Sequence, residues 1–181
     1  MGSETKWIPS SSQTVGPYFR IGLDYLIDRM AEVDAGAKDV IEIRGRVLDC
    51  DGVPVPDAML EFWNAGDSRS QEHGIPVGFR RVATDLEGYF AVRIWKPVPI
   101  LLDDGRMQAP HIMVLVFARG LMRHLISRVY LENAKGNEND PVMAGVPAER
   151  RGTLIAKLEG ENTYLWDVVL QGDKETVFFA W

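Results

Sequence analysis

Residues 111–118 read His-Ile-Met-Val-Leu-Val-Phe-Ala, and this stretch decides the fold that we expect. Its β-branched, aromatic and other apolar side chains are typical of a β-strand. Residues two apart in a strand point to the same side, so His111 and Met113 share one face. A His-x-His strand would offer a metal ion two imidazoles, whereas this strand offers one imidazole and a poor thioether ligand. The pattern therefore predicts a strand of a metal-binding kind that has lost half of its ligands.

Six other stretches, on both sides of residues 111–118, have the same apolar and β-branched composition. They are residues 40–48, 58–63, 89–95, 125–131, 164–170 and 176–181. Turn residues separate them, for example Asp51-Gly52, Glu87-Gly88 and Gly172-Asp173. Short strands separated by turns are typical of a sandwich. We therefore expect an all-β fold, a mostly antiparallel β-sandwich with long loops and little helix.

Two segments do not follow this alternation of short strands and turns. Leu23, Leu26, Ile27 and Met30 recur at helical spacing, so residues 20–33 are either an amphipathic helix or a loop with apolar anchors. Residues 132–152 are rich in Gly, Asn and Pro and are expected to form a long surface excursion.

Composition limits the classes of protein to consider. The chain has 181 residues, of which 46% are apolar and 25% charged, which is the balance of one globular domain spanning residues 1–181. The net charge of -6 opposes binding to nucleic acid. No apolar run approaches the ~20 residues of a membrane span, and the start lacks the pattern of a secretory signal. We therefore expect a cytoplasmic protein without nucleic-acid or membrane partners, and lone Cys50 offers no internal disulfide.

The three histidines, His73, His111 and His124, show no ligand clustering in the sequence. Lone imidazoles on apolar strands are usually core residues with satisfied hydrogen bonds, so a structural role is the expectation for each. Neither a zinc site nor a Gly-rich phosphate loop is predicted, and spacing alone does not define a catalytic triad.

Motifs spread from residue 12 to residue 181 resemble, in the same order, those of the intradiol ring-cleavage dioxygenases. The resemblance is greatest to the alpha subunits of heteromeric members that cleave protocatechuate. It implies a β-sandwich of the intradiol dioxygenase type. The motifs are Ser12-Gln13-Thr14-Val15-Gly16-Pro17-Tyr18-Phe19, Val55-Pro56-Asp57-Ala58, Glu61-Phe62-Trp63, Asp85-x-x-Gly88-Tyr89, Lys96-Pro97, Ala109-Pro110-His111-Ile112, Phe117-Ala118-Arg119-Gly120, Arg150-Arg151-x-Thr153-Leu154-Ile155-Ala156-Lys157 and Glu175-Thr176-Val177-Phe178-Phe179.

The resemblance also implies a ferric ion held by two tyrosinates and two histidines, and the matched positions here do not supply that set. The tyrosine positions fall at Ile100 and near Ser70, and the histidine positions fall at His111 and Met113. The family's nearby arginine falls at Gln108. One ligand of four remains, and a single imidazole does not fix ferric iron. We therefore expect no metal ligand and no catalytic residue in this chain, with the Fe(III) bound by a partner beta subunit.

Residues retained elsewhere point, through the resemblance, to a shared site. Thr14, Gly16, Pro17 and Arg119 would line the partner's pocket, in which protocatechuate reacts with dioxygen. Arg119 is the expected partner of the substrate carboxylate, because a guanidinium binds a carboxylate strongly. An N-terminal arm, about residues 1–39, would reach the beta subunit, and Trp181 would be an apolar anchor at that contact.

Other interpretations remain open on the residues alone. Arg119-Gly120 and Gly16-Pro17 are also ordinary turn dipeptides. The run Gly-x-Val-x-Asp followed by Gly-x-Pro-Val-Pro-x-Ala is similar to transthyretin-like sandwich modules, which bind or support without catalysis. An independent homodimeric intradiol dioxygenase would need its own iron ligands, against which Ser70, Ile100 and Met113 argue.

Overall fold

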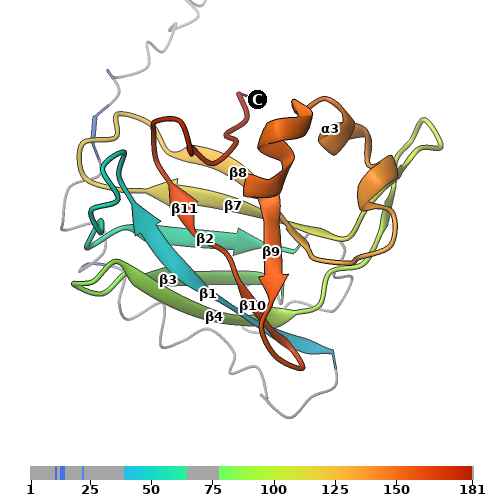
Figure 1. Ribbon diagram of the computed structural model, residues 1–181, viewed down its shortest axis with the longest axis horizontal. Helices are drawn as coiled ribbons and strands as arrows, with labels where there is room; N and C mark the ends of the chain where they lie inside the picture. The colour runs from blue at the N-terminus through green and yellow to red at the C-terminus, as the bar shows by residue number, and fades with distance from the viewer. Residues whose placement is uncertain (1–10, 12, 15–21, 23–38, 65–77, 181) are drawn as a thin grey trace, which may run out of the picture.

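β-Strands form the framework of the computed structural model, which describes residues 11, 13–14, 22, 39–64 and 78–180 (Figure 1). Six longer strands are β1 (Val40–Leu48), β2 (Met59–Trp63), β3 (Phe79–Ala83), β4 (Tyr89–Trp95), β7 (His111–Phe117) and β8 (Leu125–Leu131). Five short strands are β5 (Ile100–Leu101), β6 (Met107–Gln108), β9 (Ile155–Leu158), β10 (Thr163–Leu165) and β11 (Val168–Val169).

The strands pair into two layers joined along one side. In one layer β3, β2, β7 and β8 are antiparallel neighbours. In the other layer β1 pairs antiparallel with β4 and parallel with both β10 and β11. Strand β9 joins the layers, because it pairs parallel with β8 and antiparallel with β10. The result is the expected β-sandwich, nearly closed into a barrel.

The core between the layers follows from period-two alternation in the strands. Along β4, exposed and buried side chains alternate, and Phe90, Val92 and Ile94 point inward. The register sets Val92 opposite Ile43 of β1, and the Phe90 ring centroid lies 5.9 Å from that of Phe62 on β2. Each such side chain contributes about 1.5–3 kcal/mol on burial, so this apolar stripe holds the two layers together.

Most of the expected strands are present. Residues 40–48, 89–95 and 125–131 match β1, β4 and β8, and residues 58–63 and 111–118 each exceed the observed strand by one residue. Residues 164–170 divide between β10 and β11, and in the gap between these strands the Asp167 carboxylate accepts a hydrogen bond from Arg46 N at 2.8 Å. The expectation of all-β structure is confirmed.

The expected strand at residues 176–181 is wrong for its described part, residues 176–180. Single backbone hydrogen bonds hold it, from Thr176 N to Val169 O and from Phe179 N to Ile126 O, and these do not make a ladder. Conversely, β3 and β9 were not predicted, because charged residues such as Arg80, Arg81 and Lys157 interrupt their apolar pattern.

The expected surface excursion at residues 132–152 contains short helical turns. They are η1 (Asn137–Asn139), α3 (Pro141–Ala144) and η2 (Ala148–Leu154). The possible helix at residues 20–33 lies outside the described residues, apart from Gly22. No helix in the described part of the chain is long and apolar enough to cross a membrane.

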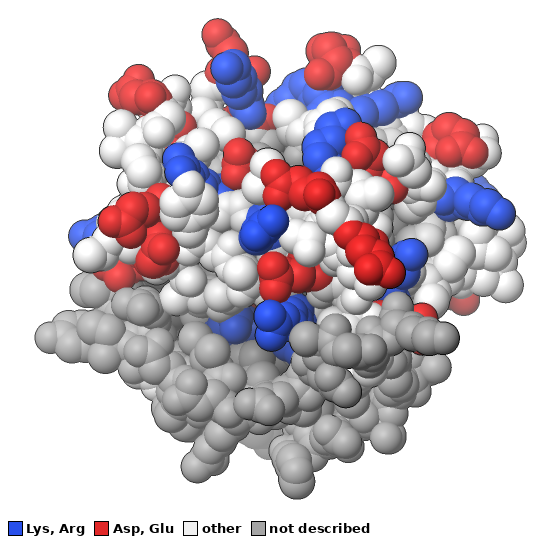
Figure 2. Space-filling view, turned by 60° about the horizontal axis from the view of Figure 1, so that its bottom comes forward, with Lys and Arg blue, Asp and Glu red and all other residues white. Residues whose placement is uncertain are grey.

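Charges of both signs lie interspersed on the described part of the surface in Figure 2. Some of them form ion pairs, as Arg93 Nε does with the Glu42 carboxylate at 3.2 Å and Arg44 Nη2 does with Glu159 at 3.1 Å. Exposed pairs of this kind contribute about 0–1 kcal/mol each, so the core rather than the surface determines stability.

One glycine allows a close approach between β1 and the segment after β10. A Cβ atom at Gly45 would lie 1.9 Å from the Trp166 carbonyl oxygen and 2.6 Å from the carbonyl carbon, both backbone atoms. The buried Trp166 side chain is itself held by a 2.9 Å hydrogen bond from its Nε1 to Thr153 O. A side chain at residue 45 therefore forces the backbone of one strand to move.

We predict that Gly45→Ala lowers the free energy of unfolding by at least about 2 kcal/mol, because overpacking a fixed backbone is costly. Urea unfolding followed by tryptophan fluorescence measures this. Gly152→Ala is the matched control, since a Cβ there meets nothing within 4 Å. It should change stability by no more than about 0.5 kcal/mol. Equal stability of the Gly45 variant and wild type would contradict the close approach.

Candidate functional site

A tight turn at the end of β7 presents Arg119. Leu121 N donates to Ala118 O at 3.2 Å, which closes the turn, and Gly120 has a φ of 88°. A side chain at that φ would be strained, so glycine suits this corner. The Arg119 side chain is 57% exposed. The local sequence thus displays a guanidinium at the surface.

Thr14 lies directly against this turn. Its Oγ1 accepts a hydrogen bond from Gly120 N at 3.0 Å, although the two residues are separated by 106 positions in the sequence. Two of the four expected pocket residues, Thr14 and Arg119, therefore occupy neighbouring positions. Gly16 and Pro17, the other two, lie outside the described residues.

A carboxylate from another loop also reaches Arg119. The Asp57 Oδ2 atom lies 3.2 Å from Arg119 Nη2, and the Asp57 side chain is 31% exposed. Asp57 precedes β2 and has a φ of 60°, a conformation that Asp and Asn tolerate better than most residues. The resemblance motif Val55-Pro56-Asp57-Ala58 contained this residue, but the sequence did not reveal its contact.

A cleft of about 590 Å³ adjoins the same turn. Its lining is mostly apolar, with Arg123 and His124 as the basic side chains. His124 is exposed, so the expectation of a buried core histidine is wrong at this position; the residue follows the Gly120 turn and reaches the surface before β8 begins. The lining residues are Gln13, Phe117, Ala118, Leu121, Met122, Arg123, His124, Leu125, Ile126, Phe178, Phe179 and Ala180.

Three of the positions matched to iron ligands, Ile100, His111 and Met113, are described, and they lie on β5 and β7. Ile100 pairs with the buried Gln108 across the β5–β6 hairpin, and its side chain has no donor atom. Met113 lies two residues beyond His111 on β7. Ser70 and His73 are outside the described residues. The described positions therefore offer one imidazole and one thioether.

His111 is a buried residue with a local hydrogen bond, as expected. Its Nδ1 lies 2.8 Å from the Ala109 carbonyl oxygen, and since a carbonyl only accepts, Nδ1 carries the proton. Burial lowers the pKa of His111 below 6.5, and the nearby positive charge of Arg128 acts in the same direction. The backbone contact to Ala109 and the Asp140 carboxylate oppose this shift.

Asp140 is the polar centre of this region, and it was not predicted. Its fully buried carboxylate accepts from Ala109 N at 2.8 Å, Tyr130 Oη at 3.0 Å, and Val142 N and Met143 N at 2.9 and 2.8 Å. The last two bonds cap α3, with Pro141 at its first position. Asp followed by Pro is a helix-start signal, so the sequence did contain a clue.

Tyr130 and Arg128 further oppose a ferric site beside His111. Burial raises the pKa of Tyr130 far above its ordinary value, so its side chain is a phenol that donates to Asp140 rather than a tyrosinate. The strand register places buried Arg128 opposite Met113 and Tyr130 opposite His111. Directly opposed side chains lie close together, so the cationic side chain of Arg128 lies beside Met113. The described residues do not fit a ferric ion.

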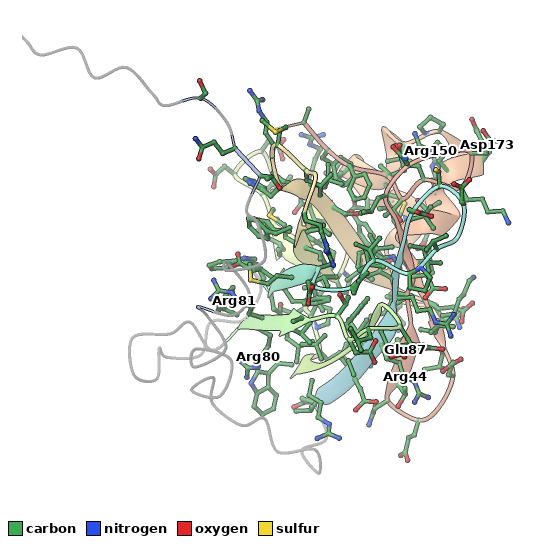
Figure 3. All side chains as sticks on the ribbon, turned by 90° about the vertical axis from the view of Figure 1, so that its left-hand side faces the viewer. Arg44, Arg80, Arg81, Glu87, Arg150 and Asp173 are labelled. Atoms are coloured by element: carbon green, nitrogen blue, oxygen red, sulfur yellow. The ribbon has the colours of Figure 1, made fainter. Side chains whose placement is uncertain are left out.

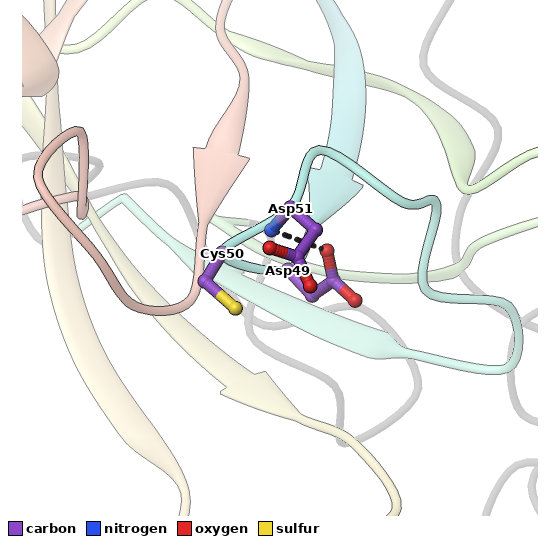
Figure 4. Close-up of side chains that lie close together, drawn as sticks. All are labelled: Asp49, Cys50 and Asp51. Carbon is purple, nitrogen blue, oxygen red and sulfur yellow. Dashed lines mark hydrogen bonds between the residues drawn. The ribbon is translucent and has the colours of Figure 1, made fainter.

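Another group of metal-binding residue types lies away from β7. Asp49, Cys50 and Asp51 have ligand atoms within 4.8 Å of one another in the turn after β1 (Figure 4). Asp49 Oδ1 accepts from Asp51 N at 2.9 Å and from Val53 N at 2.8 Å, so this carboxylate organises the turn. A structural role in the turn accounts for Asp49.

The outer face of β2 and β3 carries a largely buried ion pair. Glu61 accepts from Arg81 Nε at 3.0 Å, and the two side chains are 10% and 13% exposed. Figure 3 shows Arg80 and Arg81 on β3, far from Arg150 and Asp173 at the opposite end of the molecule. The ion pair between Glu61 and Arg81 lies on the same face of the sheet as His111 and Met113.

We predict that the lowered pKa of His111 makes the protein less stable as the pH is lowered. Below about pH 6.5 the unfolded chain binds a proton that folded His111 resists, so the free energy of unfolding decreases as pH falls. Urea midpoints between about pH 7.5 and 5.5 test this. His111→Gln should flatten the dependence relative to wild type, whereas the exposed control His124→Gln should leave it unchanged. An equal slope in wild type and His111→Gln would refute the assignment.

Comparison with known proteins adds to this geometry. A family model described as Dioxygenase matches residues 16–172. The chain is 41% identical to the protocatechuate 3,4-dioxygenase alpha chain of Burkholderia cepacia, over 93% of this chain and 95% of that one. It is 35% identical to the alpha chain from Pseudomonas putida, over 93% and 94%. The beta chain from Burkholderia cepacia is 27% identical, over 75% of this chain and 66% of the beta chain.

Solved structures agree on the fold. Hydroxyquinol 1,2-dioxygenase from Pseudomonas putida DLL-E4 superposes with a TM-score of 0.59, over 77% of this chain and 58% of that one. The sequence identity is 23%, so the likeness concerns the architecture. It matches the sandwich that the strand pattern predicts.

Proposed function

Because the chain belongs to the intradiol dioxygenase family, we propose that it is the alpha subunit of a protocatechuate 3,4-dioxygenase. The enzyme would use dioxygen to cleave 3,4-dihydroxybenzoate between its hydroxylated carbons, giving 3-carboxy-cis,cis-muconate. The 41% identity to an alpha chain over nearly the whole length carries the proposal. No observation favours the alternative, a transthyretin-like binding or structural module without a catalytic role.

In this proposal a partner beta subunit binds the ferric iron and this chain contributes no ligand. Two observations support this division. The described ligand positions hold Ile100, His111 and Met113, and a buried guanidinium lies opposite Met113. A beta chain is also among the relatives. The contribution of this subunit is then to orient substrate, exclude water and support assembly.

The turn that carries Arg119 is the proposed point of contact with substrate. Protocatechuate has a carboxylate that plain catechol lacks, and a guanidinium recognises that group through charge-assisted hydrogen bonds. The hydrogen bond between Thr14 and Gly120 supports a shared wall, because it joins the N-terminal segment to this turn. Gly16 and Pro17 belong to the same proposed wall.

Two further points belong to the proposal. Residues 1–39 would serve as an arm that reaches the beta subunit, since the Thr14 contact brings part of this segment to the Arg119 turn. The complex would work in the cytoplasm on protocatechuate and dioxygen.

We predict that Arg119→Ala, in the complex reconstituted with its beta subunit, lowers kcat/KM for protocatechuate by about 10- to 100-fold. A hydrogen bond to a charged group contributes about 1.5–3 kcal/mol, which corresponds to this loss. Oxygen uptake on protocatechuate and on catechol gives the measurement. Activity on catechol and subunit assembly should change much less, and an unchanged kcat/KM for protocatechuate would reject the role of Arg119.

We also predict that the chain purified alone is colourless and contains no stoichiometric iron, whereas the co-expressed complex is coloured by ferric tyrosinate. Elemental analysis together with visible absorption tests this. Stoichiometric ferric iron in the isolated chain would overturn the division of roles. Met113→His is a useful second sample, because it restores an imidazole but leaves Arg128 in place; it should also remain free of iron.

A further inference from the structure

We propose that Asp57 is a positioning residue that holds Arg119 in the orientation needed to meet the substrate carboxylate. This inference rests on the proposed function, since it assigns a second residue to the same site. Asp57 itself would contact neither the substrate nor a metal. The carboxylate would act on the reaction only through the guanidinium.

The contact joins two loops that are distant in sequence. Asp57 lies before β2 and Arg119 after β7, and their paired atoms Oδ2 and Nη2 are 3.2 Å apart across a separation of 62 residues. Strands β2 and β7 are antiparallel neighbours, with Met59 opposite Phe117. The start of β2 and the end of β7 therefore lie side by side at the same end of the sheet. The strand pairing brings the Asp57 and Arg119 side chains close together.

The backbone at Asp57 is fixed by a buried side chain. Thr84 Oγ1 accepts from Ala58 N at 2.9 Å and donates to Val55 O at 2.9 Å, and Thr84 is 1% exposed. Thr84 N also donates to Ala58 O at 2.8 Å. These hydrogen bonds hold the backbone on both sides of Pro56 and Asp57. They thereby maintain the Asp57 φ of 60°. An uncommon conformation held by surrounding bonds is characteristic of a residue whose direction matters.

Stability is a weak reason for this pair. Both side chains are substantially exposed, at 57% for Arg119 and 31% for Asp57, and pairs of this kind contribute little in water. Orientation is a stronger one, because a free arginine samples many rotamers and loses that freedom when it binds. The contact with Asp57 uses Nη2 of a guanidinium that has five N–H groups, so one edge can be held while another meets a carboxylate.

The test is Asp57→Asn in the reconstituted complex. Asn has nearly the same shape and tolerates a positive φ, so the substitution removes the charge and leaves the turn intact. We expect KM for protocatechuate to rise about 3- to 10-fold with kcat within about twofold, since a disordered guanidinium weakens substrate binding. Kinetics on catechol, which has no carboxylate, should not change. Asp57→Gly, which also accommodates the positive φ, provides a second variant should the first fail to assemble.

Glu42→Gln is the matched control. Its pair with Arg93 has the same 3.2 Å separation and exposures of 27% and 57%, but it lies on β1 and β4. This variant should keep the wild-type KM. A rise in KM equal to that of Asp57→Asn would show a general charge effect and overturn the inference.

A double-mutant cycle with Arg119→Ala separates the inference from the function on which it rests. In the Arg119→Ala background, Asp57→Asn should have no further effect on KM, because its effect passes through the guanidinium. An effect that persists there would overturn the positioning role, as would a normal KM for Asp57→Asn when Arg119→Ala is impaired. Normal kinetics of Arg119→Ala would instead reject the proposed function of Arg119.

Discussion

The antiparallel pairing of β7 with β8 is the constraint on which the rest of this structure depends. It turns Ile112, Val114 and Val116 into the core and sets His111 and Met113 on the outer face. The same register brings Tyr130 and Arg128 against those two positions. A shift by one residue would exchange the faces, so one set of backbone hydrogen bonds fixes both the packing of the sandwich and the surroundings of His111 and Met113.

Two regions of this sheet have opposite characters. Beside His111 the buried Asp140 carboxylate accepts four hydrogen bonds, one from the Tyr130 hydroxyl and three from backbone N–H groups. Such a network stabilises a single arrangement and leaves its donors committed. At the end of β7, by contrast, Arg119 is exposed and is held on an open turn.

Sequence patterns predicted the fold well where alternation was strong, as in β1, β4 and β8. They failed where charged residues entered a strand, as Arg80 and Arg81 do in β3, and where apolar residues 176–180 met no continuous partner. The resemblance singled out Thr14 and Arg119, and Thr14 bonds to Gly120 beside Arg119, but the pocket role of both residues stays a prediction. The contacts of Asp57, Arg128 and Asp140 join distant segments. Strand register and loop conformation determine those contacts, and local amino-acid composition predicts neither of them.

The parallel pairing of β1 with β10 and β11 has a consequence for how the chain is made. Partners such as Glu42 and Thr163 are far apart in the sequence, so one edge of β1 has no neighbour until residues 163–169 have been made. An unpaired strand edge is a template for unwanted association. Biosynthesis of this subunit therefore passes through a vulnerable interval, during which pairing with β4, whose residues are made earlier than β10 and β11, covers the other edge of β1.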